Sequence, residues 1–155
     1  MNDTAAETSL DTADILRVMR MIPHRYPMLL VDKVIKMKAD DSAVGIKNVT
    51  YNEPYFQGHF PSRPVMPGVM VIESMAQTAG VLVVHTLGPS AEGKMVYFMS
   101  VDSARFRRPI MPGDQMHIHV KRERRRGNVW RFAAEVMIDG HLAADATITA
   151  MILDQ

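Results

Sequence analysis

The sequence has no cysteine, and this absence excludes several kinds of chemistry. Disulfide bonds, thiolate zinc sites, iron–sulfur clusters and a cysteine nucleophile all require thiols. Neither sign of charge dominates, because 18 lysines and arginines stand against 17 aspartates and glutamates, for a formal net charge of +1. A balance this close does not favour a nucleic-acid-binding protein. We also find no apolar run of the ~18–20 residues that a membrane span requires.

The first ten residues, MNDTAAETSL, lack the basic and apolar regions of a secretory signal. We predict a flexible tail over residues 1–10 and a single folded domain over residues 11–155, since a domain usually has ~100–200 residues. A hydrophobic content of 47% is typical of a globular protein. The missing thiols and the missing signal suit a cytoplasmic protein.

Two helices are predicted. Apolar residues at helical spacing indicate a short helix over residues 11–21, with Asp11 or Thr12 as its N-cap. A longer helix is predicted over residues 68–87, which contain no proline and are followed by Gly88-Pro89 as a stop signal. This second helix is apolar almost all round, so we expect it to be buried.

The remaining patterned segments predict about six antiparallel strands. They cover residues 28–37, 43–49, 94–100, 115–122, 129–138 and 141–153. The pairs Gly127-Asn128 and Asp139-Gly140 suit the tight turns of antiparallel hairpins. One buried helix among six such strands is an α+β fold, with a sheet wrapped around the helix.

Polar residues with the potential for catalysis lie where a proline-rich loop, residues 51–67, leads into the long helix. The loop carries His59, and the helix begins at Gly68, where unpaired N–H groups and the helix dipole favour an anion. Glu73 follows within two turns, and Gln77, one turn further on, is placed to hydrogen-bond its carboxylate. These groups suit proton abstraction next to a carbonyl. Spacing alone leaves a structural histidine and a glutamate bridged to arginine as alternatives.

Three stretches decide between these interpretations: MIPHRYPMLLVDKV, GHFPSRPVMPGVMVIESMAQTAG and FMSVDSARFRRPIMPGDQ. Together they resemble the FabZ-type (3R)-hydroxyacyl-[acyl-carrier-protein] dehydratases of bacterial fatty-acid synthesis over nearly the whole chain. The resemblance implies a hot-dog fold and a homodimer with shared active sites, assembled as a trimer of dimers. It implies acyl carrier protein as partner, a product that supplies phospholipid and lipid A precursors, and neither metal nor organic cofactor.

The resemblance also assigns roles to residues. His59 would take the C2 proton of the 3-hydroxyacyl thioester, and Glu73 would protonate the departing C3 hydroxyl or hold the water around it. The Gly68 N–H would polarise the thioester carbonyl, with Gln77 in support. FabA-type dehydratase/isomerases resemble this motif but have Asp at the position of Glu73, which favours a dehydratase without the isomerase step.

Other polar clusters have simpler interpretations. Arg105, Arg107 and Arg108 are candidates for docking the acidic acyl carrier protein, whereas the basic run over residues 121–126 is expected to be a solvated hairpin tip. His117 and His119 share a strand face, as metal ligands can, but no third ligand is near, so a solvated face is expected.

Three questions stay open at this level. Tyr97 and Phe98 alternate on a predicted strand, and one of them could narrow the mouth of an acyl tunnel. A hot-dog acyl thioesterase would act on the same kind of thioester. A non-catalytic acyl-binding or carrier-binding protein would keep its function without His59.

Overall fold

The structure, a computed structural model, describes residues 10–153. Within these residues, seven antiparallel strands form one sheet in the order β1-β2-β3-β5-β6-β7-β4, one more than the number expected. The strands are β1 (Asp11–Ala13), β2 (Lys33–Lys38), β3 (Ser42–Asn48), β4 (Met95–Phe106), β5 (Gln115–Arg126), β6 (Val129–Ile138) and β7 (His141–Leu153). The helices are α2 (Ile15–Met21) and α3 (Gly68–Leu87), with 3₁₀ turns η1 (Pro54–Gln57) and η2 (Pro89–Ala91). The predicted α+β fold is confirmed.

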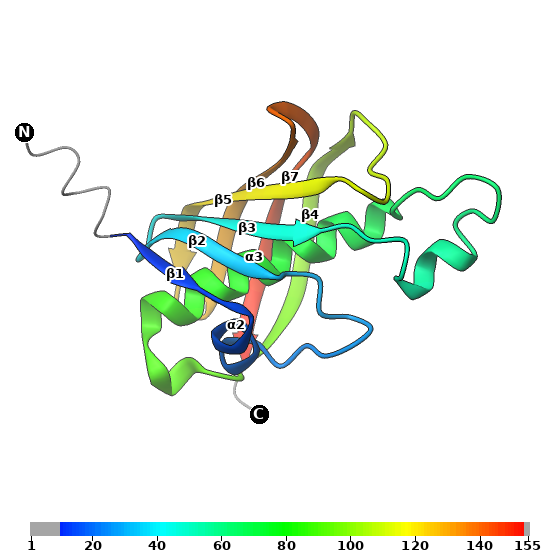
Figure 1. The fold of residues 1–155 in the computed structure, drawn as a ribbon. Helices are drawn as coiled ribbons and strands as arrows, with labels where there is room; N and C mark the ends of the chain where they lie inside the picture. The colour runs from blue at the N-terminus through cyan, green and yellow to red at the C-terminus, as the bar shows by residue number, and fades with distance from the viewer. Residues whose placement is uncertain (1–9, 154–155) are drawn as a thin grey trace, which may run out of the picture.

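The sheet curves around α3, which lies along its concave face (Figure 1). Every residue from Ser74 to Val84 is buried, as expected for a helix that is apolar all round. The core to which it belongs also contains Trp130 and Phe132 of β6, whose rings stack with their centroids 6.2 Å apart. By length and hydropathy α3 could cross a membrane, so our expectation of no such run was wrong. Burial beneath the sheet shows that it is a core helix.

The N-terminal segment differs from the prediction. The helix begins at Ile15 and not at residue 11, because Asp14 is the N-cap and its side chain accepts a hydrogen bond from the Arg17 N–H. Asp11–Ala13 instead pairs with β2 as a short edge strand. The caps proposed at Asp11 and Thr12 were therefore wrong. The tail predicted over residues 1–10 lies, except for Leu10, outside the described residues.

Strand boundaries differ in three places. The strand expected from residue 28 starts only at Lys33, because the N–H groups of Met28 and Leu29 bond back to the Arg25 carbonyl in a turn. β4 continues to Phe106 and β5 to Arg126, beyond the apolar alternation that suggested shorter strands. β6 and β7 have the predicted bounds, and the turn between them places Asp139 and Gly140 at positive φ, as its Asp-Gly sequence favours.

The helix and the sheet approach each other closely at Gly45 of β3. A Cβ added there would lie 2.9 Å from Cγ2 of Thr78 on α3, and closer still to its Oγ1. Thr78 is fully buried, and its hydroxyl donates to the Ser74 carbonyl at 2.9 Å, so its side chain has little freedom to move. Glycine at position 45 therefore allows α3 to pack directly on the strand.

Gly45→Ala is expected to lower the free energy of unfolding by about 2 kcal/mol, because it overpacks this contact. The double variant Gly45→Ala/Thr78→Ala should lose less than the sum of the two single variants, since the second change removes the atoms that clash. Urea denaturation measures all three. Gly58→Ala is the control, because a Cβ there would meet nothing within 4 Å. Additive losses at positions 45 and 78 would contradict this packing argument.

Candidate active site

His59 lies in the loop that leaves one end of the sheet and returns to α3 (Figure 1). Its N–H donates to the Tyr55 carbonyl, and its own carbonyl accepts from the Val65 N–H at 3.0 Å. The ring Nδ1 lies 2.7 Å from the Val65 carbonyl. A carbonyl can only accept, so Nδ1 carries the proton, and the neutral imidazole has Nε2 as a proton acceptor. The contact thus leaves Nε2 as the nitrogen that can act as a base when the ring is neutral.

A buried ion pair fastens this loop to the sheet. Lys47 of β3 donates to Glu53 at 2.6 Å, and their side chains are 6% and 13% exposed. The second carboxylate oxygen of Glu53 accepts from the Thr50 N–H, which closes the turn before η1. Burial, with the nearby charge of Glu53, raises the pKa of the Tyr55 hydroxyl, so this group stays protonated. The cluster therefore positions the loop that carries His59.

A cavity of about 510 Å³ joins His59 to the beginning of α3. Its polar rim contains His59, Arg107 and Arg108, and Gly68 lies at the helix N-terminus. The walls are mainly apolar: Val65, Met66, Val69, Val71, Ile72, Phe106, Pro109, Ile110 and Ala144. A Cβ on Gly68 would lie 2.9 Å from the Phe106 ring, so a side chain at this position would have to displace that ring. The cavity suits an apolar chain with one polar end.

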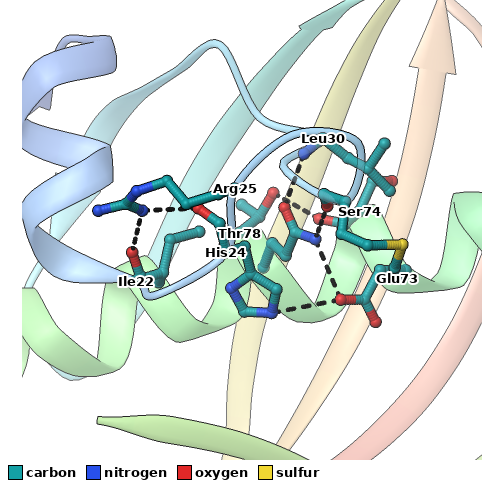
Figure 2. Close-up of polar contacts among 9 residues, drawn as sticks. Ile22, His24, Arg25, Leu30, Glu73, Ser74 and Thr78 are labelled. Atoms are coloured by element: carbon teal, nitrogen blue, oxygen red, sulfur yellow. Dashed lines mark hydrogen bonds and ion pairs between the residues drawn. The ribbon is translucent and has the colours of Figure 1, made fainter. Parts of the chain in front are cut away.

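Glu73 lies in a second polar cluster, shown in Figure 2. Its Oε1 accepts from Gln77 Nε2 at 3.0 Å and lies 3.3 Å from Nε2 of His24, which precedes the β2 strand. Burial raises the pKa of the Glu73 carboxyl, but hydrogen bonds from His24 and Gln77 lower it, and the net shift is downward. The carboxyl is therefore ionised at neutral pH.

Gln77 connects this cluster to the rest of the fold. It is 1% exposed and uses both ends of its amide. The carbonyl oxygen accepts from the Leu30 N–H at 2.8 Å, and the nitrogen donates to the Met28 carbonyl at 2.6 Å as well as to Glu73. The segment before β2 is thus hydrogen-bonded to α3 at the level of the carboxylate.

The residues singled out from sequence form two groups. His59 and Gly68 share the cavity, and Gln77 bonds Glu73, but within the described chain no hydrogen bond or ion pair joins His59 to Glu73. His24 is a residue that sequence reasoning missed. The signal available was the requirement for a partner of the buried carboxylate, together with the polar HR pair enclosed by two prolines.

The other arginines and histidines considered in the sequence analysis lie in different places and do not form one site. Arg107 and Arg108 line the cavity, and Arg107 is ion-paired with Asp145 at 2.6 Å, whereas Arg105 lies on β4 outside the lining residues. His117 on β5 is hydrogen-bonded to Gln115. Over residues 10–153, no three His, Asp or Glu side chains form a cluster that could hold a metal ion.

Solved structures share this architecture. A dehydratase heterocomplex, ApeI:P, from Xenorhabdus doucetiae is similar with a TM-score of 0.74 over 89% of this chain and 91% of that one, at 19% identity. A hypothetical thioesterase with coenzyme A from Streptococcus pneumoniae has a TM-score of 0.54 over 76% and 82%, at 17% identity. The class is the hot-dog fold, as expected. Identities this low show the fold alone and do not separate dehydratases from thioesterases.

Sequence comparison narrows this class to a family. The family model for the FabA-like domain matches residues 22–147, which include both polar clusters. A 3-hydroxyacyl-[acyl-carrier-protein] dehydratase FabZ from Paramagnetospirillum magneticum is 68% identical over 142 residues, 92% of this chain and 88% of that protein. The chain therefore belongs to the FabA-like family, among the relatives named FabZ.

The lowered pKa of Glu73 predicts how stability depends on pH. The ionised carboxylate stabilises the fold above its ordinary pKa of 4.5, and this contribution is lost as pH falls through the lower folded-state value. Relative to Glu73→Gln, the wild-type free energy of unfolding should be constant from neutral pH to about pH 5 and then decrease. Denaturation at several pH values measures the difference. A difference that grows on acidification would contradict the assignment.

Proposed function

We propose that the protein dehydrates (3R)-hydroxyacyl-[acyl-carrier-protein] to trans-2-enoyl-[acyl-carrier-protein], as a hydro-lyase of bacterial fatty-acid synthesis. The observation that carries this proposal is the Nδ1–H bond of His59 to the Val65 carbonyl, which leaves Nε2 as a base at an apolar cavity. Membership of the FabA-like family and the high identity to FabZ relatives support it. A cytoplasmic location and a supply of phospholipid and lipid A precursors belong to the same proposal.

In the mechanism, His59 Nε2 removes a proton from C2, and the electron pair forms the C2–C3 double bond as the C3–O bond breaks. The Gly68 N–H at the start of α3 stabilises negative charge on the thioester oxygen, as oxyanion donors do. The departing hydroxyl takes a proton and leaves as water. Because Glu73 is ionised, we assign it to holding this hydroxyl, and we assign delivery of the proton to the imidazolium of His59.

Within the described residues no hydrogen bond or ion pair joins His59 to Glu73, and this supports shared active sites in a homodimer. β4 is an edge strand of the sheet and carries exposed apolar side chains: Tyr97, Phe98, Met99, Val101 and Phe106. An apolar edge strand of twelve residues is a surface for pairing with another strand. Pairing of two β4 strands across a two-fold axis would unite two sheets and let each protomer contribute to both sites. A trimer of such dimers is the proposed full assembly.

The decisive experiment incubates the protein with a 3-hydroxyacyl thioester of acyl carrier protein. Wild type should produce enoyl absorbance while the thioester remains intact, whereas a thioesterase would release free thiol. His59→Ala and Glu73→Gln should each reduce kcat by at least about 100-fold, because each removes a group that handles a proton or the leaving hydroxyl. Full activity of the His59→Ala variant would place the site elsewhere, and no turnover by wild type would indicate a binding protein.

Shared sites predict complementation between two inactive variants. In a dimer of one His59→Ala and one Glu73→Gln protomer, both changes would fall in one site and leave the other intact. An equal mixture, unfolded and refolded together, should therefore recover about a quarter of wild-type activity if protomers pair at random. Each variant refolded alone is the control. No recovery in the mixture, with dimers confirmed by light scattering, would place both residues in the same protomer's site.

Carrier docking at Arg105, Arg107 and Arg108 is proposed on charge complementarity with an acidic carrier protein. Replacing all three with Glu should raise KM for the carrier-bound substrate by at least about tenfold and leave turnover of a small soluble thioester within about twofold. The comparison of these two substrates is the measurement. Equal losses on both would mean that the arginines serve the cavity itself, which Arg107 and Arg108 line.

A further inference from the structure

His24 meets the proposed catalytic carboxylate directly, although nothing in its sequence position assigns it a role. It lies just after α2, and its Nε2 is 3.3 Å from Oε1 of Glu73. Both side chains are 19% exposed. Its other ring nitrogen, Nδ1, is buried and has no hydrogen-bond partner in the described part of the chain. Figure 2 shows the imidazole turned with Nε2 towards the carboxylate.

The two donors to Glu73 converge on one of its oxygens. Gln77 Nε2 and His24 Nε2 both approach Oε1, and over residues 10–153 no partner contacts Oε2. Because Oε1 accepts hydrogen bonds from both donors, the carboxylate cannot rotate without breaking both hydrogen bonds. Oε2 is therefore the oxygen that a bound molecule can reach, and its direction is determined by the two donors.

The geometry also indicates which form of His24 is present. The ionised carboxylate of Glu73 only accepts, so Nε2 bears a proton. An imidazolium would carry a second proton on the buried Nδ1, where no acceptor lies, and burying an unpaired donor is unfavourable. Arg25 donates to the His24 backbone carbonyl at 2.6 Å, and Glu73 is the charged side chain, among the described residues, that contacts the His24 ring.

The backbone that carries His24 is fastened on its N-terminal side. The Arg25 guanidinium also donates to the carbonyls of Met19 and Ile22, at 2.7 and 3.1 Å, and so satisfies the C-terminal end of α2. Because the Arg25 side chain bonds to these carbonyls, the backbone of His24 is held in place and its imidazole is directed towards α3.

We propose that His24 is a positioning residue which, in its neutral Nε2–H form, works with Gln77 to hold Oε1 of Glu73 and to present Oε2 to the leaving hydroxyl. This proposal rests on the proposed dehydratase function. The role is different from that of His59, because His24 transfers no proton and acts through Glu73.

The test compares His24→Leu, which removes the donor, with His24→Gln, which can place a neutral N–H near the position of Nε2. The Leu variant should lose about tenfold or more in kcat, with KM for the carrier-bound substrate within about twofold, because it misplaces a group that acts on the leaving hydroxyl. The titration of its Glu73 carboxyl should move up by about one pH unit, since the carboxylate loses a hydrogen bond that favours its ionised form. The Gln variant should recover most of the lost activity and most of the wild-type titration.

His85→Leu is the matched control, because His85 also lies 3.6 Å from a carboxylate, that of Asp11, but far along α3 from Glu73. It should keep wild-type kcat and the wild-type titration of Glu73. Denaturant unfolding of all variants shows whether a loss of activity reflects loss of fold. His24→Leu with an unchanged kcat and an unchanged Glu73 titration would overturn the proposal, and so would a Gln variant as impaired as the Leu variant.

Two measurements are independent of activity. Nitrogen-15 NMR of the wild-type imidazole at neutral pH should show His24 as the neutral Nε2–H tautomer, and an Nδ1–H tautomer or an imidazolium would overturn the proposal. Carbon-13 NMR of the Glu73 carboxyl should show its titration moving to higher pH in His24→Leu, and no movement would also overturn it. If wild type shows no dehydratase activity, the proposed function fails, while these spectra still decide whether His24 holds Glu73.

Discussion

An ionised carboxylate on an otherwise apolar helix is the constraint on which this structure depends. Glu73 can stay charged beside the core only if donors meet it, and the chain supplies two from different places: Gln77 one turn along α3 and His24 from the segment between α2 and β2. These hydrogen bonds require the segment from α2 to β2 to lie against the middle of the helix. The position of one charge thus determines the path of about twenty residues at the N-terminus.

A second constraint is the close approach of α3 to the sheet. Gly45 removes the side chain that would separate helix from strand, and Gly68 makes room for the Phe106 ring at the helix N-terminus. Both glycines have ordinary backbone conformations, so their role is one of space and not of flexibility. The N-terminus of α3 therefore lies beside the cavity that His59 also lines. The free backbone N–H groups of its first turn can donate hydrogen bonds to a ligand in that cavity.

The parts predicted best from sequence are those with a long, regular pattern. The bounds of α3, β6 and β7 were predicted correctly because apolar periodicity continues to clear stop and turn signals at Gly88 and Gly140. The N-terminal helix was misplaced because three residues near it, Asp11, Thr12 and Asp14, can each act as a cap, and only the pairing of β1 with β2 decides among them. The contacts of the site were beyond prediction. The bond that sets the His59 tautomer and the approach of His24 to Glu73 join atoms that come together only after folding.

The Lys47–Glu53 ion pair has a consequence for the motions of the molecule. A loop rich in proline between two surface turns would ordinarily open and close on its own, independently of the core. Here the loop contributes Glu53 to a buried ion pair with Lys47 of β3, and loss of either partner would leave the other charge buried alone, which is strongly unfavourable. The segment that carries His59 is therefore tied to the sheet by a charge as well as by its backbone.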